Sequence, residues 1–197
     1  FTHLRAELYY QLEEWEKLEL LVRVEPQLDK TPYVRAIARR GERTVVLPLV
    51  PVVQKHNYCV PASVEMMLRL LGSSRTQDEV AEHIFDVRGS KLSTTVHYLE
   101  KLGFVCRFFI GSPPRWKRFI DEGVPVLLSV DYEQSSHVQV LFGYDERIAA
   151  FYVQDPNVFD PFVVPEEELE KWYAGTHYLS IVALPREKAA LAAELPE

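Results

Sequence analysis

The sequence predicts an α+β fold preceded by a short all-α segment. Apolar residues recur at three- and four-residue spacing near the start of the chain and again after residue 59, which is typical of helices that bury one face. Beyond residue 104 the apolar stretches are short and rich in β-branched and aromatic residues, which is typical of strands. Because helices precede strands, we expect a helical half, a sheet half and a cleft between them.

The composition favours one main globular domain and argues against a nucleic-acid partner or a membrane span. With 197 residues, 47% of them hydrophobic, the chain can bury one good core with a short appendage. Its 22 Lys and Arg against 29 Asp and Glu give a net charge of −7, and no basic run is interleaved with aromatic residues, so we expect no nucleic-acid partner. No stretch approaches the roughly 18 apolar residues that a membrane span needs.

The cysteines and the first residues bear on the compartment. Only Cys59 and Cys106 occur, and their local settings differ so much that we expect no disulfide, which fits a cytoplasmic location. The chain starts at Phe1 without an initiator Met or a signal-peptide pattern, so we expect it to be part of a longer protein.

Residues 1–40 are expected to form a helical hairpin. The apolar and aromatic positions with helical spacing are Leu4, Leu8, Tyr9, Leu12, Trp15, Leu18, Leu21 and Val22. Glu13 and Glu14 interrupt this face and Pro26 ends it, which favours two antiparallel helices over one long helix. A further short helix is expected from residue 32 to residue 40.

This segment resembles a tetratricopeptide repeat. Ala6, Tyr9 and Trp15 fall at the small and aromatic positions of that repeat, although Leu18 stands where a small residue is usual. The resemblance implies that the hairpin could recruit a protein partner, whereas an ordinary amphipathic hairpin is the alternative.

Residues 41–184 are expected to form the main domain, with residues 185–197 as a tail that could begin another helix. Residues 44–53 are β-branched but are broken by Pro48 and Pro51, which suits an edge strand or an extended connector. Helices are expected at residues 59–71, 77–85, 94–102, 114–122 and 165–173, and strands at residues 104–110, 124–130, 136–144, 149–153 and 178–184.

Cys59 is the leading candidate for a nucleophile, because it opens a helix directly after a polar loop. The unpaired backbone N–H groups at a helix N-terminus, together with the macrodipole, stabilise a thiolate. Gln54 lies five residues upstream, so its side-chain amide and the backbone N–H of Cys59 could point at one oxyanion.

His137 and Asp155 complete the candidate site. His137 begins an apolar strand, and Asp155 follows the next strand. If these two strands pair as an antiparallel hairpin, both side chains lie near the same end, where the carboxylate would orient the imidazole and leave its other nitrogen for Cys59.

These segments together resemble the papain-like cysteine peptidases, within them the group of double-glycine leader peptidases and their free-standing relatives. That group has a Gln five residues before a Cys-Gly-Pro-Ala helix start, then a His that opens a strand ending in Gly-Tyr, and later an Asp-Pro. The corresponding segments here are Gln54, Cys59-Val60-Pro61-Ala62, His137 with Gly143-Tyr144, and Asp155-Pro156. The resemblance covers residues 50–184 and implies a papain-like fold, a peptide or protein substrate, an acyl-enzyme and no cofactor.

Val60 departs from this pattern, because it replaces the glycine that usually follows the nucleophile. The alternatives to a peptidase are therefore a non-catalytic peptide-binding module and a thiol acyltransferase or transglutaminase-like enzyme. Leader processing itself is not expected, since no transporter segments accompany the domain. No metal site is expected, because no Cys-x-x-Cys or His-x-x-x-His spacing accompanies the remaining histidines.

Overall fold

The structure, a computed structural model, describes residues 1–87, 89–132 and 135–195. The chain divides into two compact units. One consists of residues 1–44 and 145–150, and the other of residues 45–144 and 151–197. Residues 196 and 197 of the expected tail lie outside the described residues.

The first unit is helical. Its elements are α1 (Thr2–Gln11), α2 (Trp15–Val24), the short 3-10 helix η1 (Pro26–Leu28) and α3 (Pro32–Ala38). The chain turns between α1 and α2 at Glu13, whose backbone is left-handed with φ 55°. The residues buried at its centre are Ala6, Tyr10, Leu18, Leu21, Leu28 and Ala36, with Ile148 packed against them.

The buried face of α1 is not the one that its leucines indicated. Leu4, Leu8 and Leu12 are 53–66% exposed, whereas Ala6 and Tyr10 are buried. The reason is the polar group that Tyr10 meets: its hydroxyl donates a hydrogen bond to the carboxylate of Asp145, the last residue of strand β6 (Ser135–Asp145). A contact between residues so distant in sequence leaves no trace in the spacing of leucines.

Arg147 ties this unit together. Its guanidinium donates to Asp145 at 2.9 Å and to Glu13 at 2.8 Å, and it lies 4.9 Å from the ring centre of Tyr10. Burial raises the pKa of Asp145, but the hydrogen bonds from Arg147 and Tyr10 outweigh it and hold that pKa below its ordinary value. The carboxylate is therefore charged and fully paired.

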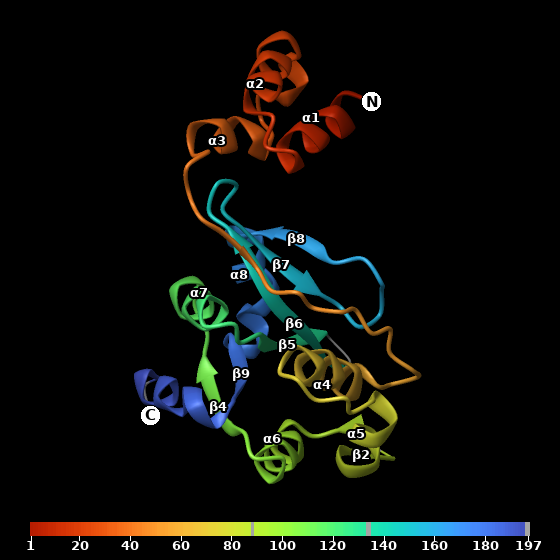
Figure 1. Ribbon diagram of the computed structural model, residues 1–197. Helices are drawn as coiled ribbons and strands as arrows, with labels where there is room; N and C mark the ends of the chain where they lie inside the picture. Colours follow the sequence, from red (N-terminus) through yellow and green to blue (C-terminus); the bar gives the residue numbers. More distant parts are fainter. Residues whose placement is uncertain (88, 133–134, 196–197) are drawn as a thin grey trace. The chain divides into compact units, whose positions relative to one another are not determined.

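The second unit is built on a sheet. Within the described residues, seven strands form it in the order β4-β9-β5-β6-β7-β8, with β1 paired to β6 (Figure 1). The strands are β1 (Thr44–Val46), β4 (Val105–Ile110), β5 (Val126–Tyr132), β6 (Ser135–Asp145), β7 (Ala150–Gln154), β8 (Phe162–Pro165) and β9 (Leu179–Leu184). β5 and β6 are antiparallel, with Val130 opposite His137.

Helices cover both faces of this sheet. α4 (Cys59–Leu70), α5 (Gln77–Ile84) and α6 (Leu92–Lys101) share one buried cluster with sheet residues such as Leu127, Ile181 and Ala183. α7 (Pro113–Asp121), α8 (Glu166–Tyr173) and the 3-10 helix η3 (Arg186–Glu194) share the other with Leu128, Val182 and Leu184. Successive residues of β5 and β9 thus point to opposite clusters, as the pleat of a strand requires.

The expected elements of this unit occur within a few residues of their predicted bounds, and Thr76 and Glu79 form a capping box before α5. Residues 44–53 form a strand over three residues only, because prolines cannot donate to a ladder. Two further features were not predicted from the sequence: β8 and a small hairpin of β2 (Phe85–Asp86) and β3 (Gly89–Ser90). Strands of two to four residues are too short for a recognisable period.

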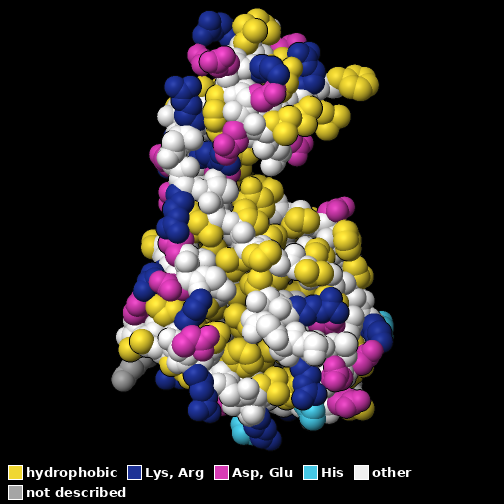
Figure 2. All heavy atoms as spheres, viewed as in Figure 1, with side chains coloured by type: hydrophobic (Ala, Val, Ile, Leu, Met, Phe, Trp, Pro, Cys, Tyr) yellow, Lys and Arg dark blue, Asp and Glu magenta, His cyan; other side chains and the backbone are white. Residues whose placement is uncertain are grey.

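The face drawn in Figure 2 carries Lys and Arg side chains interspersed with Asp and Glu. Among the described residues, each helix is too short or too polar to cross a bilayer.

Candidate active site

Cys59 is the first residue of α4 and its side chain is half-buried. The loop before it turns sharply, because the Tyr58 N–H donates to the Lys55 carbonyl and Asn57 adopts a left-handed backbone with φ 60°. Asparagine tolerates that conformation better than most residues. The turn places the thiol where the first N–H groups of the helix, which have no intrahelical acceptors, are available to a ligand.

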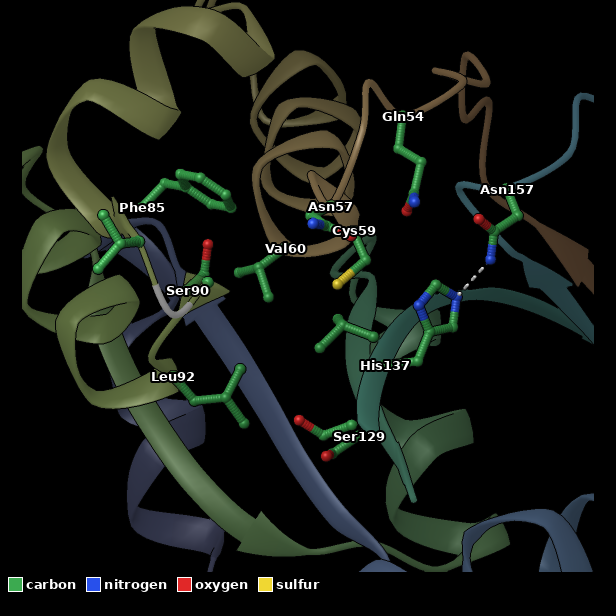
Figure 3. Close-up of a pocket in the computed structure, with 14 residues that line it drawn as sticks. Gln54, Asn57, Cys59, Val60, Phe85, Ser90, Leu92, Ser129, His137 and Asn157 are labelled. Carbon is green, nitrogen blue, oxygen red and sulfur yellow. Dashed lines mark hydrogen bonds between the residues drawn. The ribbon is translucent and has the colours of Figure 1, made fainter. Parts of the chain in front are cut away.

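His137 and Asp155 meet at one end of the β6–β7 hairpin. Nε2 of His137 lies 2.9 Å from Oδ1 of Asp155, and both side chains are more than nine-tenths buried. The opposite ring nitrogen of His137 faces the sulfur of Cys59 (Figure 3), and the interaction with Cys59 is one of the causes that raise the pKa of His137. The structure therefore brings together the three residues that the sequence indicated, in the order thiol, imidazole, carboxylate.

The electrostatics of this series favour a charged imidazole. Burial lowers the pKa of His137, but the hydrogen bonds and charges of Asp155 and Cys59 outweigh it and raise that pKa to about 9. Burial also raises the pKa of Asp155, and here the hydrogen bonds from His137, the Asn157 N–H and Gln139 prevail and lower it. At neutral pH the carboxylate is ionised and the imidazole holds its proton.

Gln54 also lines the cleft, and its side chain points toward Cys59 (Figure 3). Its backbone N–H donates to the Pro156 carbonyl at 2.7 Å, which joins it to the loop that carries Asp155. Its Oε1 is buried without a hydrogen-bond partner among the described residues. Rotation of the amide about its last bond presents Nε2 at the same place, so the group is suited to donate to an oxyanion.

Gln77 fixes the residues on either side of Gln54. Its Oε1 accepts from the Lys55 N–H at 2.9 Å, and its Nε2 donates to the Val53 carbonyl at 3.1 Å. Its own backbone N–H donates to the buried carboxylate of Glu65 on α4. The loop that carries Gln54 is thus tied to the helix that carries Cys59.

The residues that hold Asp155 in place were not predicted from the sequence. Gln139, two residues after His137 on β6, donates from Nε2 to Oδ2 of Asp155 at 2.6 Å and accepts from the hydroxyl of Tyr173. Asn157 donates its backbone N–H to Oδ1 of Asp155 at 2.7 Å, and its amide lies 3.3 Å from Nε2 of His137. The period-two spacing of His137 and Gln139 was the available signal for Gln139.

The other cysteine is separate from this site. Cys106 lies on β4, is 3% exposed, and packs in the cluster beneath α4, α5 and α6. Burial raises its pKa to about 12, so it is an inert thiol at neutral pH.

The site opens into a cleft of about 640 Å³. Its described lining residues come from the Gln54–Val60 segment, the β2–β3 hairpin, the start of α6, and strands β5 and β6, with Asn157 beside them. A helical side that carries a thiol and a sheet side that carries an imidazole, meeting at one cleft, are the arrangement of a papain-like cysteine peptidase.

Comparison with known proteins identifies the family of the chain. It belongs to the Peptidase_C39 like family, whose model matches residues 46–181. The chain has the fold of a C39-like peptidase from Bacillus anthracis, with a TM-score of 0.61 and 19% identity over 74% of this chain and 99% of that one. No curated protein gives a match.

Two peptidase domains of transporters share the fold. The peptidase domain of Streptococcus ComA, a bifunctional ABC transporter of a quorum-sensing pathway, has a TM-score of 0.59 and 19% identity over 68% of this chain and 97% of that one. A double-glycine motif protease from an AMS/PCAT transporter, in complex with the leader peptide, has a TM-score of 0.58 and 18% identity over 73% and 99%.

Proposed function

We propose that this protein cleaves a peptide bond through a Cys59–His137–Asp155 triad and an acyl-enzyme. The observation that carries the proposal is the placement of His137, whose ring faces the Cys59 sulfur on one side and is hydrogen-bonded to Asp155 on the other, in a cleft that Gln54 also lines. The leader peptide bound by a structurally similar protease supports a peptide as the substrate.

The reaction begins with the proton already on His137, whose raised pKa favours a thiolate–imidazolium pair. The thiolate of Cys59 attacks the carbonyl carbon, and the amide of Gln54 with the Cys59 N–H binds the developing oxyanion. The imidazolium then gives its proton to the leaving amine as the C–N bond breaks, which leaves a thioester on Cys59.

Water completes the cycle. His137, now neutral, removes a proton from the water that attacks the thioester, and the C–S bond breaks to release the acid and restore the pair. Asp155 holds the ring in the orientation that both steps need and stabilises its positive charge. An amine in place of water would give acyl transfer, and we propose hydrolysis because the family is one of peptidases.

The test is the rate at which iodoacetamide alkylates Cys59 between about pH 5 and pH 9, followed by peptide mass spectrometry. Cys106 is the internal control, because its pKa of about 12 keeps it protonated in this range. We expect Cys59 to react faster than Cys106 at every pH, and this advantage to fall in a His137→Ala variant.

A second measurement examines turnover. Cys59→Ala should leave the fold intact and abolish cleavage of any peptide that the wild-type protein cleaves. A Cys59→Ala variant that retained cleavage would refute the mechanism. Equal alkylation of Cys59 and Cys106 would favour the non-catalytic binding module instead.

A further inference from the structure

The wall of the cleft opposite His137 is apolar. Val60, Phe85 and Leu92 line it, and Figure 3 shows them across the cleft from His137. Val87, which follows β2, also lines the cleft and is fully exposed. None of the described residues lining the cleft is Asp, Glu, Lys or Arg. This surface therefore suits an uncharged part of a substrate.

Val60 makes the part of this wall nearest the thiol rigid. It follows Cys59 in the first turn of α4 and is 4% exposed, packed in the cluster beneath α4, α5 and α6. A β-branched side chain in a helix has one strongly preferred rotamer. A glycine here would leave this surface without a side chain, whereas valine offers two fixed methyl groups beside the reacting sulfur.

Ser90 on β3 adds an unsatisfied polar atom to the same wall. Its Oγ is buried, has no hydrogen-bond partner among the described residues, and lies near Phe85 and Val60 in Figure 3. A buried hydroxyl without a partner is unfavourable. A substrate main chain that lies along β3 would satisfy it with an N–H or a carbonyl.

The direction of the substrate follows from the chemistry. The imidazolium must give its proton to the leaving amine, so the leaving side of the substrate lies toward His137. The acyl side then runs toward the opposite wall, which carries Val60, Ser90 and Leu92.

We infer that this wall is a subsite for a branched aliphatic side chain, valine or leucine, on the residue that supplies the scissile carbonyl. Val60 and Leu92 contact that side chain, and Ser90 Oγ hydrogen-bonds the main chain beside it. The substrate class is thus a peptide with an aliphatic residue, not glycine, before the cleaved bond. The inference rests on the proposed function, because it needs Cys59 as the attacking group.

The experiment uses covalent probes, so that it does not depend on knowing a substrate. N-acylated chloromethyl ketones of glycine, alanine, valine and leucine alkylate a thiolate, with a C–S bond formed and chloride released. Their rates of reaction with Cys59 are measured by intact-protein mass spectrometry and divided by the rate with iodoacetamide, which has no side chain. We expect the valine and leucine probes to react at least about tenfold faster than the glycine probe.

Two variants examine the wall, with one matched control. Val60→Ala removes two methyl groups and should lower the leucine-to-glycine ratio about tenfold. Val34→Ala makes the same change in α3, at a half-exposed residue that does not line the cleft, and should leave the ratio unchanged. Ser90→Ala should slow all four N-acylated probes relative to iodoacetamide.

The possible results distinguish failure of the proposed subsite from failure of the proposed peptidase function. A glycine probe that matches or exceeds the others, or a ratio that Val60→Ala leaves unchanged, would overturn the subsite while a reactive Cys59 still supports the peptidase. Alkylation of Cys59 by iodoacetamide no faster than that of Cys106 would overturn both.

Discussion

The side-chain amide of Gln139 donates a 2.6 Å hydrogen bond to Oδ2 of Asp155, on the carboxylate whose other oxygen meets His137. Both residues are buried, and Tyr173 in turn donates its hydroxyl to the oxygen of the same amide. Tyr173 therefore fixes the oxygen of the Gln139 amide, while the nitrogen of the same amide fixes Asp155. A carboxylate fixed at both oxygens can orient an imidazole with little loss of entropy on reaction.

Gln139→Leu should test this role of Gln139 as a positioning residue. The hydrogen bond from Gln139 is one of the causes of the lowered pKa of Asp155, so its loss should raise that pKa. We expect kcat/KM to fall about tenfold or more, and the acid limb of its pH profile to move to higher pH. Tyr173→Phe, which keeps the bond to Asp155, should give a smaller shift. An unmoved acid limb in Gln139→Leu would contradict the role.

Gln54→Ala should separate oxyanion binding from thiol reactivity. If the amide binds only the developing oxyanion, kcat should fall about 100-fold or more while KM changes little. Alkylation by iodoacetamide forms no oxyanion, so its rate at Cys59 should match the wild type. Steady-state kinetics and alkylation of the same preparation check both expectations. A variant in which kcat and the rate of Cys59 alkylation fell equally would show that Gln54 acts on the thiol.

That Cys59, His137 and Asp155 lie together could be predicted because each stands in a local pattern: a cysteine at a helix start, a histidine at a strand start, and an Asp-Pro after the next strand. The residues that support them could not. Gln77 reaches the backbone on either side of Gln54 from another helix, and Tyr173 of α8 reaches Gln139. Such contacts depend on packing between segments, which hydrophobic periodicity does not record.

In the helical unit, too, contacts between distant residues could not be predicted from the sequence. The leucine spacing predicted the helices, but the buried face of α1 is decided by Tyr10 and its distant partner Asp145. Whether the exposed Leu4, Leu8 and Leu12 serve a protein partner, as the tetratricopeptide-like pattern implied, stays a prediction.

Arg147→Met should loosen the helical unit. It leaves the buried carboxylate of Asp145 without its cation, and removal of one partner of a buried pair costs about 3 kcal/mol or more. We expect faster amide hydrogen exchange across α1, α2 and α3. Lys17→Met, which breaks an exposed pair with Glu14, should leave the exchange rates close to those of the wild type, because solvent screens such a pair. Similar exchange in both variants would show that the Arg147 network does not stabilise the unit.

The raised pKa of His137 predicts how stability and activity depend on pH. Its folded-state pKa of about 9 exceeds the ordinary value of 6.5, so the folded protein binds the proton more tightly than the unfolded chain does. The stabilisation is complete below pH 6.5 and is lost as the pH rises through about 9. The difference in free energy of unfolding between wild type and His137→Gln, from urea titrations, should shrink across this range. The control is His3→Gln, at an exposed position, for which the difference in free energy of unfolding from the wild type should stay constant with pH. If the difference in free energy of unfolding between wild type and His137→Gln did not vary with pH, the imidazole would not be charged in the folded protein.

The same titration of His137 should limit activity. The rate of peptide cleavage should fall as the pH rises through about 9, because the imidazolium that protonates the leaving amine is lost there.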